Sequence, residues 1–254
     1  LSDVPETKNF SLEINKVDQV YGHNLVSQVK EKSKKDKVVV FQPLGSGAKR
    51  EGDFLIDSSG RSFELRDIHR IVEELNKHYA VILMSNIDIP TPKQMGAVVP
   101  DGANLLQWMG IVNACDYFLG CDSMGQHYAN ALGKPATVVI GATYPENISY
   151  PGNKDFTIID NGKETREYQP GGFKWRFLTL DVRVYVENQE DPQEVLALLM
   201  EDIERVIDNN DVLIYDDTVS PHLTTTSLTL QSLSTDEGVL SPLAIGEMTV
   251  ECRY

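Results

Sequence analysis

The sequence DYFLGCDSMGQHYANALGKPATVVIG, residues 116–141, holds the pattern that decides the predicted fold. In order it contains four parts: an apolar run at 117–120, a polar turn at 121–125, a helix candidate of small residues at 126–132 and a second apolar run at 136–140. Strand, tight turn, helix and strand in this order are typical of a βαβ unit. The stretch therefore predicts part of a parallel sheet.

The polar turn of this unit is a predicted substrate-binding site. It lies between the carboxyl end of a strand and the amino end of a helix, where free N–H groups and the helix dipole favour an anion such as phosphate. Asp122 can accept a hydrogen bond from a hydroxyl group, Gly125 lets the backbone approach a ligand, and His127 can donate. Asp122 and Ser123 are also ordinary N-cap residues, a role worth about 1 kcal/mol without any ligand.

Three further loops follow predicted strands and should meet at the same edge of the sheet. They contribute Gly45, Ser46 and Lys49 after the strand 38–41, Asn86 after the strand 80–84, and Thr143 after the strand 136–140. Glycines permit close backbone approach, and lysine supplies a cation. An ordinary glycine-rich surface loop explains the first of these loops equally well.

The remaining sequence predicts the other elements and the domain boundaries. Helical periodicity and capping residues predict helices at 22–35, 62–79, 104–115 and 191–208. Residues 161–190 are expected to be rich in loops, and the Thr/Ser-rich sequence from 209 onward alternates like β-strands. We therefore expect an α/β fold: a linker or connecting helix at 1–37, a Rossmann-like domain with a doubly wound parallel sheet at 38–208, and a small β-rich extension at 209–254.

Composition restricts the class of protein. The 254 residues carry a net charge of −15, which argues against binding to nucleic acid or to an anionic membrane surface. No apolar run reaches the roughly 20 residues of a membrane-spanning helix, and the polar first residues do not resemble a signal peptide. The three cysteines lack metal-ligand spacing, so we expect reduced thiols, no metal site and a cytoplasmic location.

Residues 38–208 resemble the C-terminal domain of the heptosyltransferase family, glycosyltransferases of the GT-B architecture. The resemblance is strongest at 104–145, where the family has a strand, Asp-Ser/Thr-Gly and two more residues to a His, a helix ending in Leu-Gly-x-Pro, and then Gly and Thr-x-Pro. This sequence has Met124 in place of the family's Gly after Asp-Ser, and its own glycine is Gly125. The matching residues are Asp122, Ser123, His127, Leu132, Gly133, Pro135, Gly141, Thr143 and Pro145. The resemblance implies one half of a GT-B fold.

The resemblance also implies a function and roles for individual residues. Asp122, Ser123 and Gly125 would contact the diphosphate and sugar of a nucleotide-sugar, with His127 supporting the loop and Lys49 neutralising charge on the leaving group. The nucleotide-diphosphate sugar would be a donor substrate, with no separate cofactor and no metal. The catalytic residues stay unassigned, because in that family the base and the acceptor site belong to an N-terminal domain for which residues 1–37 are too short.

Three functions therefore remain open. The first is a glycosyltransferase donor domain whose site is completed by a longer protein or by another chain. The second is a non-catalytic, glycosyltransferase-like assembly module that joins an oligomer or larger complex through residues 209–254. The third is a Rossmann-like protein that binds a nucleotide without sugar chemistry.

Overall fold

The computed structural model describes residues 12–254 except 53, 90–94, 142–155, 161–162, 173, 189, 211, 217–218 and 240–241. The chain divides into two compact units, Leu1–Phe156 and Thr157–Tyr254. These boundaries differ from the predicted ones, because residues 16–33 pack within the first unit and residues 192–208 pack within the second. In the described part of the chain, no helix is long and apolar enough to cross a membrane.

The first unit contains a parallel sheet in the strand order β6-β5-β1-β4. The strands are β1 (Val38–Gln42), β4 (Ala80–Leu83), β5 (Tyr117–Cys121) and β6 (Ala136–Ile140). Every residue of β1 and β4 is buried, as expected for parallel strands that are covered on both faces. The predicted α/β class with a parallel sheet is confirmed.

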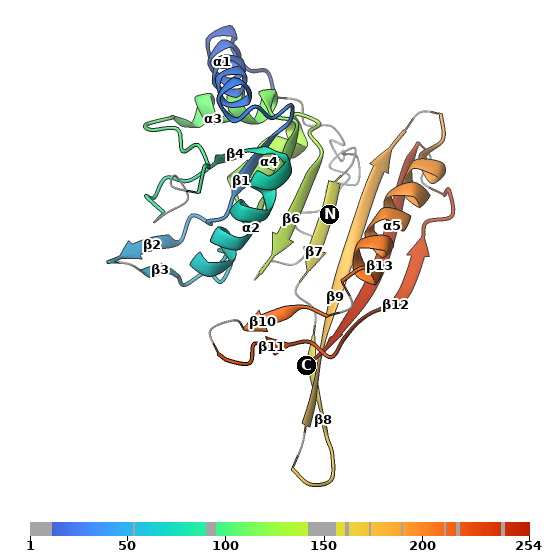
Figure 1. The fold of residues 1–254 in the computed structure, drawn as a ribbon. Helices are drawn as coiled ribbons and strands as arrows, with labels where there is room; N and C mark the ends of the chain where they lie inside the picture. The colour runs from blue at the N-terminus through green and yellow to red at the C-terminus, as the bar shows by residue number, and fades with distance from the viewer. Residues whose placement is uncertain are drawn as a thin grey trace, which may run out of the picture. The chain divides into compact units, whose positions relative to one another are not determined.

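The helices of this unit are α1 (Lys16–Ser33), α2 (Leu65–His78), α3 (Leu105–Ala114) and α4 (Met124–Ala131) (Figure 1). A small hairpin joins β2 (Ala48–Glu51) to β3 (Phe54–Asp57). On α2, Ile68 and Val72 are fully buried in one cluster with Phe41 and Leu83 of the sheet. Asn104 caps α3 through a capping box with Gln107, which satisfies backbone donors at the helix start.

Helix α1 packs closely on α3, so it is an integral part of the first unit. Gly22 and Gly110 face each other at the crossing, and a Cβ on Gly22 would overlap the carbonyl group of Gly110. A Cβ on Gly110 would likewise overlap the Asp18 carbonyl. An ion pair of 2.8 Å between Lys30 Nζ and Asp116 Oδ2 ties the far end of α1 to the residue before β5.

The second unit is built around the long strand β9 (Lys174–Glu187), which pairs antiparallel with β8 (Glu164–Tyr168) and β13 (Leu243–Arg253). Strand β12 (Ser227–Thr235) pairs with β13, and β7 (Phe156–Asp160) neighbours β9 in the strand order. A separate pair joins β10 (Ile214–Asp216) to β11 (Leu223–Thr224). The prediction of a loop-rich segment at 161–190 is wrong, and the predicted β structure after 209 is confirmed.

Helix α5 (Pro192–Asp208) covers the sheet of the second unit. It begins as predicted, with Pro192 in the first turn and the Asp191 side chain accepting from the Glu194 N–H at 2.9 Å. Leu196 and Met200 are buried against β9 and β13. Helix and sheet thus share one apolar core, which explains why α5 belongs with the β-rich part of the chain.

Candidate functional site

The residues predicted to hold a substrate lie mainly at the carboxyl edge of the parallel sheet in the first unit. Asp122 and Ser123 connect β5 to α4, and both are buried. The Asp122 carboxylate accepts a hydrogen bond of 2.9 Å from Gln126 Nε2 in the first turn of α4. Ser123 is the N-cap residue, but its side chain makes no capping bond. Asp122 therefore stabilises the helix start through Gln126.

Gly125 packs against the strands beneath it. Its N–H donates a 2.7 Å hydrogen bond to Gln42 Oε1 at the end of β1, and a Cβ on Gly125 would overlap this oxygen and the Phe118 ring. Gln42 Nε2 in turn donates to the Leu44 carbonyl at 3.4 Å. The close backbone approach expected of Gly125 is therefore an approach to Gln42, and the N–H expected to bind phosphate already has a partner.

Replacing Gln42 with leucine should destabilise the first unit by about 2 kcal/mol, because the buried Gly125 N–H would lose its acceptor. The measurement is urea unfolding followed by Trp108 fluorescence in a Trp175→Phe background, since the chain contains only these two tryptophans. Gln28→Leu, at an exposed position of α1, is the matched control and should change stability by less than about 0.5 kcal/mol. Equal stability of the Gln42 variant and this control would show that the Gln42–Gly125 bond contributes little.

His127 lies on the exposed side of α4. Partial desolvation lowers the pKa of its imidazole below the usual value, and the Asp122 carboxylate opposes this shift. This shift disfavours a positive charge on the ring at the helix start.

Of the residues predicted in the loop after β1, only Gly45 and Ser46 lie in that loop. The Gly45 N–H donates to Ser62 Oγ at 2.9 Å, and Ser46 Oγ accepts from the Arg61 guanidinium at 3.2 Å. Lys49 is an exposed residue of β2, opposite Ile56, so its predicted place in the loop is wrong. Asn86 is exposed in a bend after the edge strand β4, and Thr143 lies outside the described residues.

A polar cluster that sequence reasoning missed is centred on Asp57. Its carboxylate accepts hydrogen bonds from the backbone N–H and the hydroxyl groups of Ser59 and Ser62. Desolvation raises the pKa of this carboxyl, but the four hydrogen bonds outweigh it and lower the pKa to about 2. The turn-forming sequence DSSGRS at 57–62 was the available signal. Ser62, predicted to cap a helix, bonds Asp57 instead, and α2 begins at Leu65.

The low pKa of Asp57 makes part of the stability depend on pH. The folded-state pKa of about 2 lies below the usual unfolded value of about 3.9. The contribution is therefore complete above pH 4 and is lost as pH falls from about 4 to 2. Because the group is partly exposed, we expect about 1 kcal/mol. The stability difference between wild type and Asp57→Asn, measured by urea unfolding, should shrink between pH 6 and pH 3; a constant difference would contradict the assignment.

The same turn lies against the end of β6. A Cβ on Gly141, the residue after β6, would overlap the Gly60 carbonyl oxygen. The segment 57–62 therefore covers part of the strand edge where a nucleotide was expected. Around this edge, hydrogen bonds within the chain already engage Asp122, Gly125, Gly45 and Ser46.

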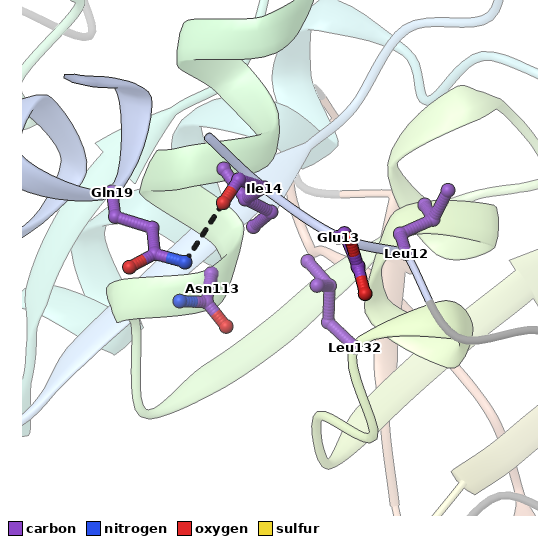
Figure 2. A pocket seen from close by; sticks show the side chains of 6 residues that line it. All are labelled: Leu12, Glu13, Ile14, Gln19, Asn113 and Leu132. Atoms are coloured by element: carbon purple, nitrogen blue, oxygen red, sulfur yellow. Dashed lines mark hydrogen bonds between the residues drawn. The ribbon is translucent and has the colours of Figure 1, made fainter. Parts of the chain in front are cut away.

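Three cavities of the first unit lie away from these residues. One of about 360 Å³ lies where the chain enters α1, and Figure 2 shows its lining by Leu12, Glu13, Ile14, Gln19, Asn113 and Leu132. Two others, of about 470 and 480 Å³, lie near the amino ends of the strands and beside Tyr79. None of the three is lined by a predicted substrate-binding residue. Within the described ranges, no cluster of His, Cys, Asp and Glu is arranged to hold a metal ion.

A part of the chain that includes the second unit is similar to phage tail proteins. A family model described as "Bacteriophage Tail Tube Terminator Protein" matches residues 139–254. The tail tube terminator protein p142 of Escherichia phage T5 is 40% identical over 105 residues, which are 39% of this chain and 64% of that protein. The chain thus matches less than two thirds of the length of this relative.

Solved structures with a similar fold are glycosyltransferases. Heptosyltransferase II of E. coli shows 17% identity and a TM-score of 0.43, over 64% of this chain and 46% of that one. A family 9 glycosyl transferase of Veillonella parvula shows 12% identity and a TM-score of 0.45, over 62% and 44%. The chain spans less than half of either protein, and structural similarity this distant gives no information about function.

These findings correct the predicted function. The expectation of a glycosyltransferase that binds a nucleotide-sugar is contradicted by the family match over residues 139–254 and by the 40% identity to p142. They favour the alternative, a non-catalytic assembly module. The physical reason for the error is that a strand–turn–helix pattern specifies a fold, whereas the function depends on which groups remain free at the site.

Proposed function

We propose that the chain is a structural component of a phage tail that closes the tail tube. The observation that carries this proposal is the family match over residues 139–254, which includes the whole second unit, Thr157–Tyr254. The match therefore concerns a complete folding unit with its own core, and not an isolated motif.

The geometry of the first unit is consistent with an assembly role. At the edge where a substrate was expected, Gly125, Asp122 and Asp57 are used for hydrogen bonds that hold the fold together. In this proposal the parallel sheet is a scaffold and the second unit contacts the tube.

The test uses tail tubes from Escherichia phage T5 particles that lack p142. The purified full-length chain, carrying a gold label, is mixed with these tubes and observed by electron microscopy. We expect label at one end of each tube, and we expect unlabelled p142 to displace it. Absence of label at tube ends, or label spread evenly along the tubes, would contradict the proposal.

One variant separates this function from the predicted substrate site. Asp122→Asn changes the first unit at the former candidate site and should leave end-labelling unchanged. Loss of labelling in a folded Asp122→Asn variant would show that the first unit, and not the family-matched part, carries tube binding.

A further inference from the structure

The hairpin of β8 and β9 gathers most of the positive charge of the second unit. Residues 157–254 contain 19 Asp and Glu but only seven Lys and Arg, a net charge of −12. Five of the seven lie on the hairpin or on the strand end paired with it: Lys163, Arg166, Lys174, Arg176 and Arg253. This group, with Tyr168, Trp175 and Tyr254, is called the basic hairpin below.

Ring contacts hold the arginines of the basic hairpin in place. The Arg253 guanidinium lies 4.4 Å from the centroid of Trp175, and that of Arg176 lies 5.9 Å from the centroid of Tyr254. Glu164 accepts from the Tyr254 hydroxyl at 2.8 Å and forms an ion pair of 2.8 Å with Arg166, so this acid fixes the position of Arg166 and offsets part of the positive charge. Arginine, tryptophan and tyrosine are the residue types that contribute most to protein interfaces, and prior ordering lowers the entropy lost on binding.

The surface of the basic hairpin is open to solvent. All five residues of β8 are exposed, and Tyr168 at its end is 75% exposed. A large aromatic side chain this exposed beside a cluster of cations is typical of a docking surface.

The outer face of α5 has the opposite character. Its exposed acids include Glu194, Glu201, Asp202 and Asp208, and its single cation, Arg205, is paired with Glu201 and Asp202. Leu198 and Val206 lie among these acids and are 58% and 63% exposed. The face therefore combines negative charge with uncovered apolar side chains, which complements the cations and aromatic rings of the basic hairpin.

Within one molecule these two surfaces are far apart. Helix α5 packs on β9 near Val184, whereas Arg166 lies opposite Arg176, eight steps along β9, and Lys174 lies ten steps along it. At about 3.3 Å per residue, these steps correspond to about 26 and 33 Å along the strand. Figure 1 shows the β8 turn and α5 towards opposite ends of β9. The hairpin can therefore meet such a face only on another molecule.

We propose that the basic hairpin of one copy docks on the outer face of α5 of a second copy. The contact joins two different surfaces, so a pair of copies still has one free hairpin and one free helix face. Further copies can therefore add head to tail until the assembly closes into a ring or extends as a filament. Charge complementarity selects a second copy over nucleic acid, because DNA would bring its phosphates to a unit of net charge −12. This interface requires no tail tube, so it is tested with the purified chain alone.

The experiment measures self-association of the full-length chain by analytical ultracentrifugation at low and high salt. The double variant Arg166→Glu with Lys174→Glu reverses the charge at two positions of the hairpin. The double variant Glu201→Lys with Asp202→Lys reverses the charge at two positions of the helix face. All four positions are exposed. Each reversal should weaken association at least about tenfold. An equimolar mixture of the two reversed proteins should recover association, because both contacts between unlike proteins again join opposite charges: native hairpin with native helix face, and reversed hairpin with reversed helix face.

Matched controls change the same charge elsewhere. Lys32→Glu with Lys34→Glu is the control for the hairpin reversal, and Glu31→Lys with Asp36→Lys is the control for the helix reversal. These four exposed positions lie in or just after α1, and both controls should leave association unchanged. A wild-type chain that stays monomeric at about 0.1 mM, where interfaces of micromolar affinity are occupied, would overturn the proposal. The proposal would also be overturned if neither charge reversal weakened self-association, or if only the hairpin reversal weakened it. If the chain slowed the electrophoretic migration of duplex DNA, and the hairpin reversal abolished this effect, the hairpin would be a nucleic-acid-binding surface instead.

Discussion

Gly110→Ala is expected to destabilise the first unit by about 3 kcal/mol. At an exposed helix position the same change would stabilise by 0.5–1 kcal/mol, because alanine is the better helix former. Here the added methyl group would overlap the Asp18 carbonyl, and a backbone atom cannot rotate away as a side chain can. The steric cost of separating two packed helices exceeds the gain in helix propensity.

The measurement is urea unfolding with Trp108 fluorescence in the Trp175→Phe background. Trp108 lies on α3 and is buried, so it reports on the helix that carries the substitution. Gly22→Ala changes the other side of the same crossing and should give a loss of similar size. The double variant should lose less than the sum, because both substitutions disrupt one contact.

Ser27→Ala, at an exposed position of α1, is the control and should change stability by no more than about 0.5 kcal/mol. A Gly110→Ala protein as stable as this control would show that α1 does not pack on α3 as described. Residues 16–33 would then be better described as a linker, as the sequence predicted.

Leu196→Ala is expected to destabilise the second unit by 2–5 kcal/mol, the usual range for a large-to-small change in a core. Leu196 is fully buried in one cluster with Val184 and Met248. The strands beneath it lie close to the helix, because Gly246 of β13 has no side chain and a Cβ there would overlap Met200. A cavity at Leu196 can therefore collapse little, which places the expected loss in the upper part of the range.

This loss is measured by urea unfolding with Trp175 fluorescence in a Trp108→Phe background. Leu198→Ala lies two residues away on the same helix but at an exposed position, and it should change stability by less than about 0.5 kcal/mol. Equal losses for the two variants would mean that α5 does not bury the face described here.

The sequence predicted well those strands and helices whose local residue pattern directly reflects how they are buried or capped. β1 and β4 are continuous apolar runs because parallel strands are covered on both faces. Helix α5 was predicted to begin at Asp191-Pro192, and the structure places Asp191 at its N-cap and Pro192 in its first turn. Such signals depend on neighbouring residues only.

Strand β9 was missed although its residues from Phe177 to Val186 largely alternate. Charged residues interrupt the pattern, and they are tolerated because their partners come from β13, 64 and 68 positions away. Arg183 pairs with Glu247 at 2.7 Å, and Asp181 accepts from the Thr249 hydroxyl at 3.0 Å. A cross-strand pair of this kind is invisible until the register of the sheet is known.

Local sequence patterns were enough to predict an α/β chain with a parallel sheet in its first part, β structure in its last part, and a strand–turn–helix unit at Asp122. The role of that unit depends on its tertiary contacts. Gln42 comes from a strand 83 positions away to bind the Gly125 N–H, and the turn at Gly60 comes to lie against Gly141. Whether a polar group is free for a ligand depends on such distant partners, and no local pattern of residues specifies them.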